Sequence, residues 1–193
     1  MYLDAALRWI HYTFAIFWLA QVYFLGFVFS SVGPSLDEET RRKLVPRLLP
    51  KVGFLSGIAS LVAVASGLWL MKDLYAGPAG MAAAGGARMS WISLGAALAL
   101  VMFLLGVAVQ MPASMRITRA LKAGEAPDPG AMGKMAWSGK ASLYLSTPVI
   151  FCMMLGAGHD TLAFSPGPIL FVLVLCAAVT ALFGLLAARF QPR

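Results

Sequence analysis

Residues 168–188 read PILFVLVLCAAVTALFGLLAA, without a single charged side chain. A helix that crosses a bilayer needs roughly 20 mostly apolar residues, and this run supplies them. The whole chain has 193 residues, 60% of them hydrophobic and 12% charged, with a mean hydropathy of +0.81. So few polar residues cannot cover the surface of a soluble domain of this length. The sequence therefore predicts a protein whose solvent is the lipid bilayer.

Four further apolar runs precede this one. The predicted fold is an all-α integral membrane bundle of five transmembrane helices, forming a single domain over residues 1–193. No Asp, Glu, Lys or Arg lies deep inside any span, and charges near the ends can reach the interface. The predicted spans are about 6–32, 52–71, 90–111, 139–158 and 168–188.

The first and third connections carry most of the charged residues. Ser35 followed by Glu38 is a capping-box pattern, which predicts a surface helix over about 35–46. Pro46 and Pro50 are expected to end that helix. A basic loop, broken by prolines, is expected over 112–138.

The distribution of cations predicts the orientation. With five spans, twelve of the 15 Lys and Arg residues fall on the side opposite the N-terminus, and the formal net charge of +7 lies there. Cytoplasmic loops carry the excess of Lys and Arg. The N-terminus is therefore expected outside and the C-terminus in the cytoplasm, in a bacterial inner membrane, with the surface helix on the cytoplasmic side. The twelve are Arg41, Arg42, Lys43, Arg47, Lys51, Arg116, Arg119, Lys122, Lys134, Lys140, Arg189 and Arg193.

The same distribution bears on partners. A pI of about 9.8 would point to nucleic acid in a soluble protein, but here the charge follows one membrane face. The expected partners are membrane lipids and a redox partner protein or larger membrane complex, and no nucleic acid.

Two histidines are the main candidates for chemistry. His11 lies about one turn into the first span and His159 at the end of the fourth, so both fall near the outer face. Histidine within a span is a functional candidate, and two at one depth can ligate one metal ion or both faces of a haem. The alternative is that interfacial imidazoles only hydrogen-bond lipid headgroups or water.

The neighbours of the histidines extend the candidate site. Ala15 and Trp18 share the helical face of His11, and Gly156 lies one turn before His159. Small residues let a flat macrocycle approach the backbone, although ordinary helix packing favours them equally. The three outer-face cations could bind haem propionates or lipid headgroups. They are Arg8, Lys72 and Arg88.

Several stretches resemble a known family, the membrane domain of bacterial cytochrome-c-linked urate oxidase, which is similar to the wider CopD and HemJ group. They are LRWIH at 7–11, IFWL at 16–19, RKLVPR at 42–47, SGLWL at 66–70, RALKAGEAPDP at 119–129 and LSTPVIF at 145–151. The resemblance implies redox work and haem b, with the family's histidines at His11 and His159. The chain departs from the family in lacking a C-x-x-C-H motif for haem c.

Rival functions remain open at this stage. A cofactor-free accessory subunit would use small-residue helix faces to pack against a larger complex. A HemJ-like protoporphyrinogen oxidase would share the first-helix histidine but is expected to carry a lysine within a span, which the sequence lacks. Copper handling is disfavoured because only two His are present. The sequence does not decide whether the protein is catalytic, and it identifies no catalytic residue.

Overall fold

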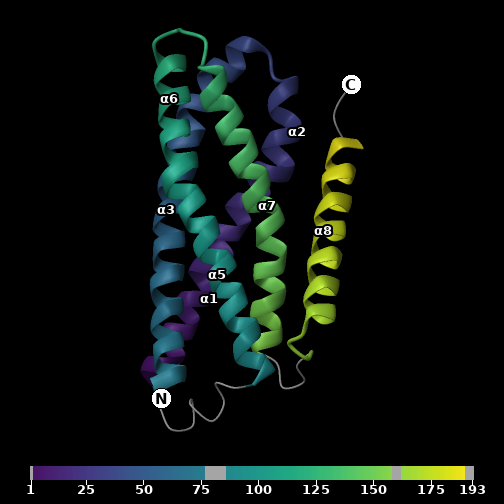
Figure 1. Ribbon diagram of the computed structural model, residues 1–193. Helices are drawn as coiled ribbons and strands as arrows, with labels where there is room; N and C mark the ends of the chain where they lie inside the picture. Colours follow the sequence, from purple (N-terminus) through teal and green to yellow (C-terminus); the bar gives the residue numbers. More distant parts are fainter. Residues whose placement is uncertain (1, 77–85, 158–161, 190–193) are drawn as a thin grey trace.

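The computed structural model describes residues 2–76, 86–157 and 162–189, and these form a bundle of helical rods without β-strands. Successive rods run in opposite directions along the long axis (Figure 1). The first comprises α1 (Tyr2–Tyr23), η1 (Phe24–Phe29), α2 (Ser30–Val32) and η2 (Gly33–Ser35), and the second is α3 (Glu38–Ala76). The third comprises α5 (Ala87–Leu105), η3 (Gly106–Gln110) and α6 (Met111–Lys122), and it is followed by α7 (Pro129–Ala157) and α8 (Pro166–Arg189).

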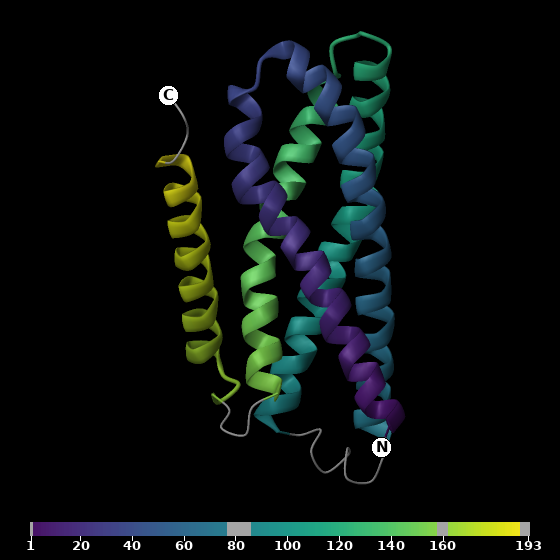
Figure 2. The ribbon, with the colours of Figure 1, turned by 180° about the vertical axis from the view of Figure 1, so that it is seen from behind.

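Four of these rods are long and apolar enough to cross a membrane by length and composition: Tyr2–Ser35, Glu38–Lys72, Ala87–Lys122 and Pro166–Arg189. The all-helical, multi-pass membrane architecture predicted from the sequence is thus confirmed at that level. The predicted span at 139–158 corresponds to the second half of α7, which is not among the four. That helix runs alongside α5 and α6 through the bundle (Figure 2).

The surface helix predicted over about 35–46 is not a separate element in the structure. It is the start of α3, which continues to Ala76 with Pro46 and Pro50 inside it. A proline removes one backbone hydrogen bond and strains the preceding turn. Tertiary packing opposes this effect here, because the adjacent Val45 and Leu49 are buried against α6 and α7.

The start of α3 also differs in its cap. Asp37, rather than Ser35, accepts the capping hydrogen bond, from the Thr40 N–H at 2.8 Å. The Ser35 hydroxyl turns back to the Val32 carbonyl at 2.7 Å. The hydrogen bond to Thr40 lowers the pKa of the Asp37 carboxyl, which lies outside the membrane-spanning segments.

The basic loop predicted over 112–138 is much shorter in the structure, because α6 continues to Lys122 and α7 begins at Pro129. Gly124 has a φ of 76° and ends α6, with the Glu125 N–H bonded back to the Ala120 carbonyl at 2.9 Å. Asp128 caps α7 by accepting from backbone N–H groups. These caps end α6 and start α7, which leaves only a short connection between the two helices.

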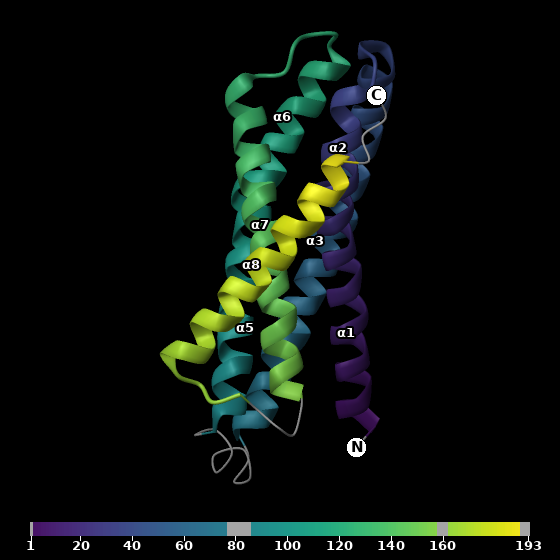
Figure 3. The same cartoon turned by 90° about the vertical axis from the view of Figure 1, so that its right-hand side faces the viewer.

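Polar contacts link the rods within the apolar zone. The Gln110 amide donates to the Ser142 hydroxyl at 2.9 Å and to the Ser138 carbonyl at 3.1 Å, which joins η3 to α7. The hydroxyls of Thr147 and Thr180 lie 2.8 Å apart and join α7 to α8. Helix α8 otherwise packs mainly on α7 and crosses the bundle obliquely at its edge (Figure 3).

Candidate functional site around His11

His11 lies on α1 where this helix packs against α3. Its Nδ1 lies 2.9 Å from the Ala63 carbonyl oxygen on α3, and the Ser66 hydroxyl lies 3.4 Å from the same nitrogen. The imidazole is partly buried. The ring is therefore held on the neighbouring helix and does not point freely into lipid or water.

This contact determines which ring nitrogen carries the proton. A carbonyl oxygen can only accept, so the Nδ1 of His11 must be the donor toward Ala63. The Nε2 atom of the neutral ring then keeps its lone pair. Histidines that bind metals commonly have this arrangement, in which a backbone carbonyl orients the ring and raises its basicity. This tautomer thus leaves Nε2 with the lone pair that a hydrogen-bond donor or a metal ion requires.

Gly67 makes the close approach of the ring possible. A Cβ atom at this position would lie 2.8 Å from Cε1 of His11 and 3.2 Å from its Nδ1. Carbon atoms in ordinary contact are about 3.5 Å apart or more, so any side chain here would displace the ring. Glycine at this position of α3 is therefore part of the His11 site.

Trp18 and Ala15 extend from the same side of α1 into the core. Trp18 is buried in a cluster with Ala59, Ala63 and Met102, and Ala15 packs against that cluster. The structure thus shows these two residues in helix packing, and the cluster connects the His11 region to α3 and α5.

Two of the three cations predicted for the outer face have partners on their own helices. The Arg8 Nε forms an ion pair with Asp4 at 2.9 Å, between side chains that are about half exposed. The Lys72 amine lies 5.8 Å from the centroid of the Trp69 ring. Exposed contacts of this kind contribute little stability and are easily exchanged for another partner.

The third cation, Arg88, links two helices. Its Nε donates to the Gly156 carbonyl at 2.5 Å and so satisfies one of the free carbonyls in the last turn of α7. Gly156 itself packs closely, because a Cβ there would lie 2.1 Å from Cγ1 of Ile92. The space beside Gly156 is filled by α5. Trp91 strengthens this corner by donating its indole N–H to the Leu162 carbonyl at 2.8 Å.

His159 lies outside the described residues, so its role remains a prediction. The described part of the chain contains no cluster of three or more His, Cys, Asp or Glu residues that could hold a metal ion. It does place Gly156, three residues before His159, at the same end of the bundle as Arg88. The structure therefore brings His11 to α3, and it leaves the meeting of the two histidines untested.

Sequence reasoning did not assign roles to Ala63, Ser66 or Gly67, which make the His11 site. Ser66 and Gly67 belong to the stretch SGLWL at 66–70, and these two adjacent small residues were the available signal. Nothing in the sequence could identify Ala63 as the partner of His11, because it acts through a backbone carbonyl, which every residue type has.

The fold and this site define a class: a multi-pass helical membrane protein with a histidine oriented between its first two rods. A family model for the urate oxidase N-terminal family matches residues 43–186. Since this is well over half of the chain, the protein belongs to that family. The matched segment contains Lys72, Arg88, Gly156 and His159 but begins after His11. No curated protein and no solved structure matches the chain.

Proposed function

We propose that this protein binds haem b in the membrane and transfers electrons near the outer face, as a subunit of a larger redox complex. One observation carries the proposal: the Nδ1–H of His11 is held by the Ala63 carbonyl, so that Nε2 has the lone pair with which a histidine binds iron. Membership of the urate oxidase N-terminal family supports a role connected with urate oxidation. When bound, haem would supply a one-electron iron couple.

We also propose that the chain crosses the membrane five times, with its N-terminus outside. Helix α7 is the remaining span, the fourth in chain order: it packs against α5 and α8, and it carries buried serines that share contacts with Gln110. Five spans place the N-terminus and His11 outside, because the Lys and Arg residues concentrate on the other face. The membrane would be the inner membrane of a bacterium.

The other residues proposed to bind the haem belong to the same end of the bundle as His11. His159 is the proposed second axial ligand. Arg88 is the best-placed cation for a haem propionate, since its Nε bond to Gly156 leaves the other guanidinium N–H groups for an anion. Arg8 and Lys72 can serve if their exposed contacts with Asp4 and Trp69 open.

The test is the optical spectrum of the purified full-length protein. We expect a reduced-minus-oxidised spectrum with a haem b α-band, and a pyridine haemochrome assay that counts bound haem. His11→Ala and His159→Ala should each remove most of the bound haem, and added imidazole should restore part of the Soret band in a His11→Gly variant. A Soret band that survives both alanine substitutions unchanged would exclude these ligands.

The rival accessory-subunit function would give a different result. Many large apolar side chains on α8 are exposed, including Leu170, Phe171 and Leu185 at about 60% or more. This face can contact a partner protein as well as lipid. Isolation of the wild-type protein in a stable complex, with no haem in the complex and no haem uptake on reconstitution, would favour this alternative over the redox function.

A further inference from the structure

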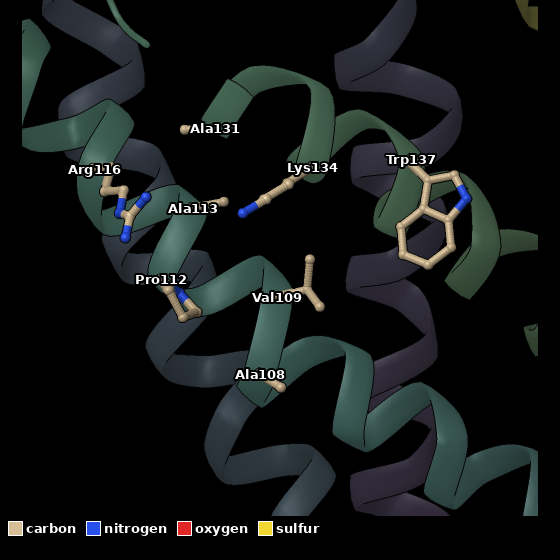
Figure 4. Close-up of a pocket in the computed structure, with 8 residues that line it drawn as sticks. All are labelled: Ala108, Val109, Pro112, Ala113, Arg116, Ala131, Lys134 and Trp137. Carbon is tan, nitrogen blue, oxygen red and sulfur yellow. The ribbon is translucent and has the colours of Figure 1, made fainter. Parts of the chain in front are cut away.

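A second site lies at the opposite end of the bundle from His11, between η3, α6 and the start of α7. A cavity of about 360 Å³ opens there. Figure 4 shows the side chains that line it, with the Lys134 amine extending from α7 toward Ala113 on α6. The remaining lining residues are Ala108, Val109, Pro112, Arg116, Ala131 and Trp137.

The cavity has a cationic part and an apolar part. Arg116 and Lys134 supply two positive charges from facing helices, and Ala108, Val109 and Pro112 supply an apolar wall. Trp137 is 61% exposed, and amphipathic indole rings are enriched at the level of lipid headgroups. A ligand that matches both parts has an anionic head and an apolar tail.

The two cations lack the partners that other cations of this chain have. At the start of α3, Arg42 pairs with Glu38 at 2.6 Å and Lys43 pairs with Glu39. Within the described residues, no ion pair is found for Arg116 or Lys134. Asp128, the carboxylate nearest in sequence to Lys134, uses its oxygens to accept from the N–H groups of Gly130 and Ala131.

The surroundings of the cavity favour a lipid over a soluble anion. Met115 and Met132, on the same two helices, are each 52% exposed. On the apolar rod 87–122, the lining residues Ala108 to Arg116 come just before the basic last turn with Arg119 and Lys122. An acyl chain can therefore continue from the cavity along exposed apolar side chains while its headgroup stays with the cations. Basic pockets between membrane helices bind lipid phosphates in this way.

We propose that this cavity binds the phosphate of an anionic phospholipid, with Arg116 and Lys134 as its charged contacts and Trp137 beside the upper acyl chain. The proposal does not depend on haem binding. Each Lys or Arg near a membrane surface contributes enough attraction to change affinity about fivefold, so the pair should contribute about 30-fold.

The experiment compares lipid binding to the full-length protein by native mass spectrometry after titration with phosphatidylglycerol or phosphatidylcholine. We expect the wild type to retain phosphatidylglycerol preferentially. The double variant Arg116→Gln/Lys134→Gln should bind it about 30-fold more weakly. The matched control is Arg119→Gln/Lys122→Gln, which removes the same charge from α6 at positions that do not line the cavity and should keep most of the wild-type affinity.

A second measurement uses the wild-type fold. Phosphatidylglycerol with brominated acyl chains should quench a fluorescence component that is missing in Trp137→Phe, and phosphatidylcholine with the same chains should quench it less. Three results would overturn the proposal: equal losses in the two double variants, equal retention of the two lipids, or displacement of the lipid by inorganic phosphate at comparable concentration. The last result would assign the cavity to a free anion.

Discussion

The substitution Gly67→Ala tests the His11 site most directly. The new methyl carbon would lie 2.8 Å from Cε1 of His11, whereas carbon atoms in contact are about 3.5 Å apart or more. The ring or the helix must therefore move by about 0.7 Å. Along the bond to Ala63, a movement of this size would stretch the present 2.9 Å distance to about 3.6 Å, which is no longer a hydrogen bond.

Under the proposed function, loss of this bond should weaken the binding of haem. Removing the group that orients a metal-binding histidine typically lowers affinity about 10- to 100-fold. We therefore expect Gly67→Ala to lose haem during purification or under titration with a competing haem acceptor, while the protein stays folded. The assay is the haemochrome content per protein, together with the position of the Soret band and the thermal unfolding midpoint.

Gly57→Ala provides a matched control on the same helix. A Cβ at Gly57 would meet no atom within 4 Å, and alanine is favoured over glycine in a helix by up to about 1 kcal/mol. This variant should bind the proposed haem as the wild type does and unfold at the same or a higher temperature. If Gly67→Ala matches Gly57→Ala in haem content, spectrum and stability, the close packing of His11 against α3 has no functional role.

Three other outcomes follow from the packing and the caps. Gly156→Ala should destabilise the protein by about 1–3 kcal/mol through overpacking against Ile92. Adding Ile92→Ala should recover stability, and an unchanged melting temperature in the single variant would contradict this contact. Gln110→Leu should cost about 0.6–1.7 kcal/mol in chemical unfolding, because it breaks an interhelical hydrogen bond. Gln21→Leu, whose amide bonds only within its own helix, should cost clearly less, and equal costs would refute the assignment. Asp37 has a lowered pKa, so the stability contributed by its negative charge at the cap is complete above the unfolded pKa of about 4 and is lost as pH falls through the lower folded pKa. Asparagine can still cap through its amide oxygen, so the unfolding midpoints of wild type and Asp37→Asn should differ at neutral pH and converge at low pH, and a difference that persists at low pH would argue against the role of the charge.

The membrane architecture was predictable because it depends on local properties of the chain. An apolar run such as 168–188 must lie in hydrocarbon wherever the other helices are, and the bilayer thickness sets its length. The structure has α8 at Pro166–Arg189, within two residues of that prediction. His11 was likewise identified from residue type and position alone, because a titratable side chain in a span is rare.

Helix ends were predicted less well where a local signal competes with tertiary packing. Pro46 and Pro50 read as helix breakers, yet α3 passes through both, because Val45 and Leu49 gain burial against α6. The same burial extends α6 into the region expected to be a loop. Proline and glycine predict where a helix would end in an isolated chain. Burial of apolar side chains against neighbouring helices can stabilise the helix beyond that point.

The sequence by itself determined that the chain is a bundle of apolar helices with its cations mostly at one end, since hydropathy and charge belong to each residue separately. Only the tertiary structure decided what His11 contacts. Its partner is a backbone carbonyl on Ala63, 52 positions away in the sequence. Every residue has such a carbonyl, so the residue type at position 63 does not predict the contact. The contact forms only when α1 and α3 pack together.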